Sequence, residues 1–183
     1  MRPILLPIVL ALVAAPVQAQ GTFKLTSKEI APHATIGAAQ VFNSFGCSGQ
    51  NISPSLAWTG APAGTKSFAL TVYDPDAPTG SGWWHWVVYN IPATATSIVA
   101  GAGDAKKSLL PAGSVQGATD FGTPGYGGPC PPAGAKAHHY IFTLYSLKVD
   151  KMDIPAGATA ALVGFNIHAN KLRAATFTGL YGR

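Results

Sequence analysis

The stretch Lys66–Pro92, KSFALTVYDPDAPTGSGWWHWVVYNIP, contains two runs of apolar and β-branched residues, and a turn rich in Pro and Gly separates them. In the first run, Phe68, Leu70 and Val72 fall on one face of a strand. Neither run alternates between polar and apolar residues, which is typical of strands covered on both faces. The first run ends at Asp74, because the prolines that follow cannot continue a strand ladder. The stretch therefore predicts two neighbouring central strands.

Similar runs occur on both sides of this stretch. AHHYIFTLYSLKV (Ala137–Val149) is the longest and predicts a third central strand. TFKLTS (Thr22–Ser27) and AATFTGLYG (Ala174–Gly182) predict a first and a closing strand. The segment Pro92–Ala137 is dense in Gly and Pro and is expected to consist mainly of loops.

Near the C-terminus the apolar period changes from that of a strand to that of a helix. Leu162, Phe165, Ala169 and Leu172 recur at helical spacing. We therefore predict a helix from about Ala158 to Leu172.

The composition favours a single, mainly β domain. The chain has 183 residues, of which only 10% are charged, with 21 Gly and 15 Pro. This length suits one domain, and the composition favours turns and strands over a helical bundle. The formal net charge is +5, but the basic residues are scattered singly apart from Lys106 and Lys107. This distribution does not resemble a nucleic-acid-binding face.

Residues 1–19, MRPILLPIVLALVAAPVQA, have the pattern of a cleavable signal peptide, with an apolar run followed by a small-residue end. Cleavage would leave one domain, residues 20–183, in the periplasm or outside the cell. The alternative is an uncleaved anchor, but the run is shorter than the roughly 20 residues that a bilayer span needs. No second long apolar run follows, so the mature chain is expected to have no transmembrane span.

Two cysteines, Cys47 and Cys130, are present. In an oxidising compartment they allow one disulfide. The alternative is two buried thiols whose backbones lie too far apart to be bridged. The residues alone leave both possibilities open.

The central strands bring polar side chains to one rim. If the two strands of Lys66–Pro92 are neighbours, Asp74 and His85 can meet where the first ends and the second begins. A carboxylate that accepts a ring N–H would fix the imidazole tautomer and favour its charged form. A period of two places His85 on the face opposite Trp84 and Trp86, while Trp83 is expected just outside the strand.

The third strand and the loop before it add further candidates. His138 and His139 face opposite sides of the strand, and His138 shares its face with Tyr140. The loop GYGGPCPP (Gly125–Pro132) could form an anion-binding concavity with its backbone N–H groups. It lacks the Lys and Ser/Thr that follow in phosphate-binding loops.

Structural interpretations compete with these functional ones. Asp side chains in a turn often bond their own backbone, and we keep this interpretation for Asp76 while favouring a pocket role for Asp74. His85, taken alone, is more simply a core histidine whose ring is hydrogen-bonded. Trp84 and Trp86 are expected in the core because of their large apolar area. Tyr140 fits either a core or a pocket position.

Several motifs together resemble the phosphatidylethanolamine-binding protein family, and in particular its bacterial Raf-kinase-inhibitor-like branch. The resemblance covers nearly all of residues 20–183, in order and spacing. Its motifs are FGCSGQNISPSLAW (Phe45–Trp58), DPDAP (Asp74–Pro78), GWWHWVVYNIP (Gly82–Pro92), GYGGPCPP (Gly125–Pro132) and HHY (His138–Tyr140).

The resemblance implies an antiparallel β-sandwich with a few short peripheral helices. It also implies a small cavity for phosphate or phospholipid headgroups such as phosphatidylethanolamine. Many family members have Arg at the position of His139, which is expected to face away from the cavity. Carried over to this chain, the cavity residues are Asp74, Trp83, His85, Gly128, Pro129, Cys130, Pro131, His138 and Tyr140.

Three functions remain as hypotheses. The first is an exported binding protein for such anions, with no cofactor and no metal. The second is a protein-interaction or inhibitor module acting on a protease or a host factor; an exported protein would not meet the cytosolic kinases of the family name. The third is a hydrolase that uses His and Asp, but G-x-S-x-G and H-E-x-x-H are absent, so we expect no enzymatic activity.

Overall fold

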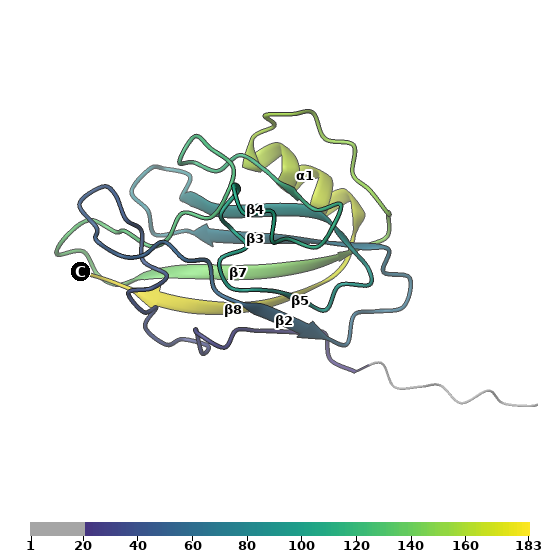
Figure 1. Cartoon of the computed structure of the whole chain (residues 1–183), viewed down its shortest axis with the longest axis horizontal. Coiled ribbons are helices and arrows are strands. Elements are labelled where there is room, and N and C mark those ends of the chain that lie inside the picture. Colours follow the sequence, from purple (N-terminus) through teal and green to yellow (C-terminus); the bar gives the residue numbers. More distant parts are fainter. Residues whose placement is uncertain (1–20) are drawn as a thin grey trace, which may run out of the picture.

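The computed structural model describes residues 21–183, so the predicted signal peptide lies outside the described residues. Two antiparallel sheets pack face to face, and a helix covers the outer face of the larger one (Figure 1). The elements are β1 (Lys24–Thr26), β2 (Leu56–Thr59), β3 (Ser67–Asp74), β4 (Trp83–Pro92), β5 (Ser97–Ile98), β6 (Val115–Gln116), β7 (His138–Leu147), α1 (Ala160–Asn170) and β8 (Lys171–Tyr181).

The larger sheet has the strand order β6-β4-β3-β7-β8, and the smaller has the order β1-β2-β5. The three predicted central strands, β3, β4 and β7, are therefore internal to the larger sheet. Side chains from both sheets meet in one core, which includes Trp58 of β2, Phe68 of β3 and Phe142 of β7. The predicted mainly β sandwich is confirmed.

A second, smaller core lies between the larger sheet and α1. The residues of α1 that it buries are Ala160, Val163 and Ile167. The predicted helix is confirmed, but the residues whose spacing indicated it do not form its buried face: Phe165 is 72% exposed. The two stripes have the same helical spacing, and periodicity cannot choose between them when a helix is apolar on most sides. Among residues 21–183, α1 is the one helix present, and it is not long enough to cross a membrane.

A β-bulge at the start of β4 reorients His85. Val72 pairs with Trp86, whereas the next residue of β3, Tyr73, pairs with Trp84. His85 is thus an extra residue without a partner in β3, so the alternation of faces is interrupted there. His85 lies on the side of Trp86 and of the main core, and the predicted opposition of these two side chains is wrong. Trp83, expected outside the strand, pairs with Asp74 inside it.

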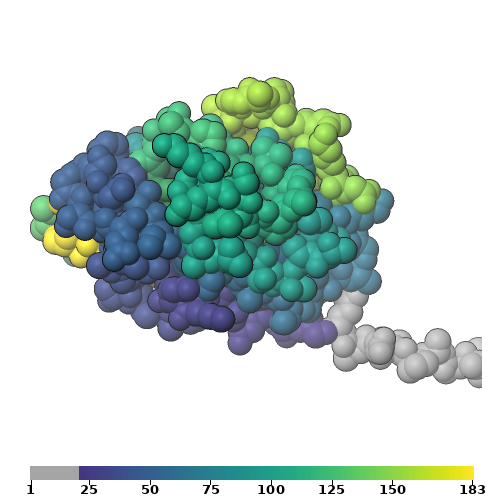
Figure 2. Space-filling model, viewed as in Figure 1, coloured from purple at the N-terminus to yellow at the C-terminus, as the bar shows by residue number. Residues whose placement is uncertain are grey.

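Cys47 and Cys130 form a disulfide with a Cα–Cα distance of 6.0 Å, across a sequence separation of 83 residues. Of the two possibilities that the sequence leaves open, the structure contains the bridged one. In the chain-entropy model, closing a loop of this length stabilises the fold by about 4 kcal/mol. The bridge ties segment 38–55 to the loop before β7. Segments 38–55 and 99–127 lie side by side on the surface (Figure 2) and share backbone hydrogen bonds such as that from Gly101 N–H to Ser53 O.

Candidate functional site

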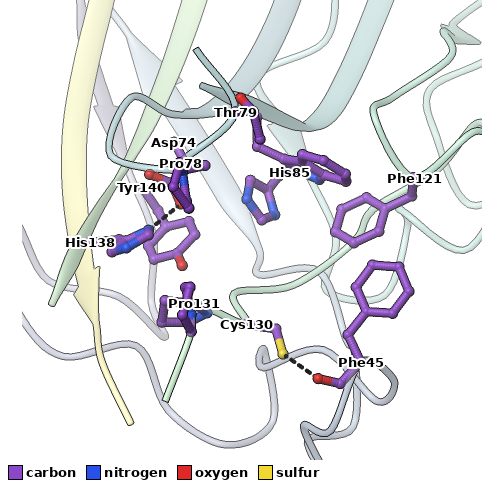
Figure 3. Close-up of a pocket in the computed structure, with 13 residues that line it drawn as sticks. Phe45, Asp74, Pro78, Thr79, His85, Phe121, Cys130, Pro131, His138 and Tyr140 are labelled. Carbon is purple, nitrogen blue, oxygen red and sulfur yellow. Dashed lines mark hydrogen bonds and ion pairs between the residues drawn. The ribbon is translucent and has the colours of Figure 1, made fainter. Parts of the chain in front are cut away.

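A cavity of about 180 Å³ opens at one end of the larger sheet, where β3 ends and β4 and β7 begin (Figure 3). The turn between β3 and β4 forms one wall, and the loop before β7 forms another. The lining residues are Phe45, Asp74, Ala77, Pro78, Thr79, Trp83, His85, Phe121, Cys130, Pro131, Pro132, His138 and Tyr140.

Asp74 and His138 form a buried pair in this cavity. His138 Nδ1 donates to Asp74 Oδ2 at 2.8 Å, and the two side chains are 8% and 4% exposed. The predicted pair of Asp74 with His85 is therefore wrong. β7 is the other neighbour of β3, so it also brings a histidine to the end of that strand. Asp74 Oδ1 accepts from Asp76 N–H at 2.8 Å, which means that Asp74 both forms the turn and braces the imidazole.

His85 is neutral in this environment. Its Nδ1–H donates to Gly127 O at 2.7 Å, because a carbonyl oxygen can only accept. Burial lowers the pKa of His85 from 6.5 to about 4, against the smaller opposing effects of this hydrogen bond and of the Asp74 charge. The expectation of a charged His85 is wrong, because loss of solvation outweighs both effects. Its Nε2 is therefore an acceptor.

The neutral state of His85 predicts a pH dependence of stability. Its folded pKa lies below the unfolded value, so its contribution is complete above pH 6.5 and decreases as the pH falls towards about 4. Between pH 7 and pH 4.5, the unfolding free energy of the wild-type protein is expected to fall by about 2–3 kcal/mol more than that of a His85→Gln variant. Urea unfolding of both proteins at both pH values measures this difference. Parallel losses in the two proteins would contradict a neutral, buried imidazole.

Tyr140 presents a buried hydroxyl to the cavity. The residue is 1% exposed, and its hydroxyl has no hydrogen-bond partner among residues 21–183. Burial, together with the negative charge of Asp74, raises the pKa of Tyr140, so the hydroxyl keeps its proton and is a donor. Its ring packs edge-on against His85 with centroids 5.0 Å apart, and the hydroxyl points into the hollow (Figure 3). An unpaired buried hydroxyl costs about 1–3 kcal/mol, which a bound ligand would offset.

The loop before β7 contributes its second half to the cavity. Cys130 and Pro131 line it, whereas Gly128 and Pro129 do not. The N–H groups of Gly127 and Gly128 donate to His85 O and to Asn51 Oδ1. These amides hold the loop in place and are not available to a ligand, so the predicted concavity of backbone donors is wrong for them.

Sequence reasoning missed six lining residues. Ala77 and Pro78 belong to DPDAP and Thr79 directly follows it, so that motif is the signal that could have identified all three. Pro132 closes the loop motif. Phe121 packs edge-on against both Trp83 and His85, with centroids 5.4 Å away in each case. Phe121 and Phe45 come from irregular segments, and no periodic pattern marks them.

A second Asp–His pair lies outside the cavity. Asp76 Oδ2 accepts from both the backbone N–H and the Nδ1–H of His139, at 2.7 Å in each case. The expectation that Asp76 bonds its own turn is therefore wrong. His139 points away from His138, as strand alternation predicts, and its pair with Asp76 is exposed to solvent.

The lining of the cavity has three polar groups that can meet a ligand and no Lys or Arg side chain. It offers Nε2 of His138, Nε2 of His85 and the Tyr140 hydroxyl, surrounded by aromatic rings and prolines. Arg183 contacts a lining residue from outside the lining set: its Nε–H donates to Pro131 O at 2.7 Å. Within the described range, no group of three His, Cys, Asp or Glu side chains could hold a metal ion.

Comparisons with known proteins agree with the fold and the motifs. Residues 26–182 match the model of the phosphatidylethanolamine-binding protein family. The chain is 50% identical to YbcL of Escherichia coli over 181 residues, which cover 99% of this chain and 98% of YbcL. The crystal structure of YbcL, described as a new member of the mammalian family of this name, superposes with a TM-score of 0.86 at 52% identity, covering 90% of this chain and 99% of that one.

Two further relatives are more distant. A phosphatidylethanolamine-binding protein homologue from Chlamydia trachomatis superposes with a TM-score of 0.73 at 30% identity, covering 88% of this chain and 97% of that one. A Mycobacterium tuberculosis protein named as a lipoprotein, LppC, is 44% identical over 115 residues, which cover 63% of this chain and 52% of LppC. Family model, sequence and fold agree: the chain belongs to the phosphatidylethanolamine-binding protein family.

Proposed function

We propose that this protein binds a phosphate group in the cavity, either as a free anion or as part of a phospholipid headgroup such as phosphoethanolamine. The observation that carries the proposal is the unpartnered hydroxyl of Tyr140, a buried residue whose ring packs edge-on against His85. Buried polar groups are hydrogen-bonded in almost all native structures, so this donor is expected to meet an acceptor when the cavity is filled.

Each of the three polar groups is expected to contact a different part of the ligand. Tyr140 donates to a phosphate oxygen. Because Asp74 accepts from Nδ1–H of His138, the Nε2 of that ring faces the ligand in a fixed orientation and accepts from a P–OH group or a bridging water. Neutral His85 accepts at Nε2, which suits a P–OH group, an ammonium arm or a bridging water. A cavity of about 180 Å³ is smaller than the sites of drug-sized molecules, so it holds a headgroup and not a whole lipid.

We further propose that the site binds its ligand without converting it. Cys130 is the cysteine of the cavity wall. It is bonded to Cys47 in the disulfide, so it has no free thiol that could act as a nucleophile. Turnover of a panel of phosphate esters by the wild-type protein, lost in a His85→Ala variant, would contradict this part of the proposal.

The proposed setting is the periplasm or the outside of the cell. The disulfide between Cys47 and Cys130 suits an oxidising compartment, and LppC, a relative, is named as a lipoprotein. The first cysteine of the present chain is Cys47, which is bridged, so lipid attachment at a cysteine near the leader is not part of the proposal. A protein partner acting through the same surface remains compatible with anion binding.

Titration with phosphate or phosphoethanolamine tests the proposal. The imidazole signals of His85 and His138 are expected to shift in NMR spectra, whereas those of the exposed His168 stay constant. Tyr140→Phe is expected to weaken binding about tenfold or more, because a hydrogen bond to a charged group contributes roughly 1.5–3 kcal/mol. Tyr145→Phe, on the same strand but facing the other way, is the matched control. Unchanged His85 and His138 signals at millimolar ligand would refute the proposal.

A further inference from the structure

Two phenylalanines separate the cavity from a larger one. Phe45 and Phe121 line the phosphate cavity and also a neighbouring cavity of about 640 Å³. Their rings are stacked with centroids 6.0 Å apart, and Phe42 packs against both. In Figure 3 the two labelled rings stand together on one side of the hollow, opposite His138 and Tyr140. We call Phe45 and Phe121 the phenylalanine ridge.

The larger cavity differs in character from the phosphate cavity. Its lining has a larger polar share than that of the phosphate cavity, and it carries one acidic and one basic residue. Its polar and charged side chains are Asn43, Gln50, Asn51, Asp104, Lys106, Thr119 and Thr123. A ligand that extends over the phenylalanine ridge would therefore have its phosphate group in the smaller cavity, an apolar contact with the two rings, and hydrogen-bonding groups around it in the larger cavity.

Phe45 is held in place although it is exposed and strained. Its side chain is 65% exposed, and its backbone has a φ of 56°, which non-glycine residues rarely adopt. The disulfide of Cys47 fixes the chain two residues away. Arg183 donates from Nη1 to Gly46 O at 2.8 Å and from Nε to Pro131 O at 2.7 Å, which joins this turn to the cavity wall. Backbone strain kept by such supports is common at ligand-binding positions.

We propose that the two cavities form a single two-compartment site for phosphate esters, with Phe45 as the residue that selects esters over free phosphate. The phosphate group occupies the smaller cavity, and the ester substituent crosses the phenylalanine ridge. The polar part of the ligand beyond it reaches the larger cavity. This inference rests on the proposed phosphate site and adds the class of ligand that the site prefers.

Calorimetric titration of four probes tests the ridge. These are inorganic phosphate, phosphoethanolamine, phenyl phosphate and dihexanoyl phosphatidylethanolamine below its micelle concentration. Phe45→Ala is expected to weaken binding of phenyl phosphate and of the short-chain lipid about tenfold more than it weakens binding of inorganic phosphate. Phe45→Gly, which tolerates the positive φ, is expected to behave in the same way. Tighter binding of phenyl phosphate would indicate a small aryl ester as the ligand, and tighter binding of the short-chain lipid would indicate a phospholipid.

Phe165→Ala is the matched control, because Phe165 is also highly exposed but lies on α1, on the outer face of the larger sheet. It is expected to leave all four affinities unchanged. Backbone NMR signals of Gln50 and Thr123 are expected to shift with the short-chain lipid and not with inorganic phosphate, since these residues line the larger cavity and not the phosphate cavity.

The outcomes separate this inference from the proposed function. Equal losses for phosphate and esters in the Phe45 variants, or no loss for either, would overturn the role of Phe45 and leave the phosphate site intact. Shifts induced by the short-chain lipid that are confined to the smaller cavity would overturn the second compartment. Failure of the wild-type protein to bind any of the four probes would refute the proposed function itself.

Discussion

Replacing Gly128 with alanine is expected to destabilise the protein by about 3 kcal/mol and to disorder one wall of the cavity. A Cβ atom at this position would overlap Gln40 O and lie 2.7 Å from Phe42 N and 2.8 Å from Val41 C. These neighbours are backbone atoms, so the overlap cannot be relieved by rotation of a side chain. The displaced loop would also lose the hydrogen bond from Gly128 N–H to Asn51 Oδ1. Urea unfolding measures the loss.

Gly164→Ala is the control for this substitution. Gly164 lies within α1, and a Cβ there would have no neighbour within 4 Å. Because alanine favours the helix more than glycine does, a gain of about 0.5–1 kcal/mol is expected. A Gly128→Ala variant as stable as the wild type would show that the loop does not pack against residues 40–42 in solution.

Replacing Asp74 with alanine is expected to cost about 3 kcal/mol and to weaken phosphate binding at least tenfold. The substitution leaves the Nδ1–H of His138 without its acceptor in a buried site and removes the acceptor for Asp76 N–H. The imidazole then has neither a fixed tautomer nor a fixed orientation, so its Nε2 is no longer held towards the ligand. Urea unfolding and calorimetric titration with phosphate measure the two effects.

Asp76→Ala provides a matched comparison, because Asp76 and His139 form an Asp–His pair of the same kind on the surface. The side chains of His139 and Asp76 are 53% and 40% exposed, so removing the carboxylate is expected to cost less than about 1 kcal/mol and to leave phosphate affinity unchanged. Similar effects of the two substitutions on affinity would mean that overall charge, and not the buried pair, governs binding.

The central position of three strands follows directly from the sequence. The runs now seen as β3, β4 and β7 lack polar alternation, and burial on both faces is the physical cause of that pattern. The position of Asp74 at a strand end follows from the prolines after it. The arrangement of these strands as a sandwich came from the resemblance of whole motifs to a family, not from periodicity.

Other features of the site depend on tertiary contacts that the sequence does not encode locally. The bulge at His85 interrupts the alternation of side chains between the two faces of β4. No glycine or proline at that position indicates the bulge in the sequence. The partner of Asp74 depends on which strand lies on each side of β3, a question that spacing along the chain does not answer. Phe45 and Phe121 meet because a disulfide and Arg183 fix one loop, while contacts across the surface fix the other.

The account rests on a phosphate group binding between two imidazoles and a phenol at the end of the larger sheet. A crystal structure of residues 20–183 grown with saturating phosphoethanolamine tests this most directly. We expect the phosphorus atom inside the cavity, with one phosphate oxygen accepting from the Tyr140 hydroxyl and a P–OH group or a bridging water donating to Nε2 of His138. A cavity that holds only water at saturating ligand, or phosphate found solely at surface lysines, would contradict the account.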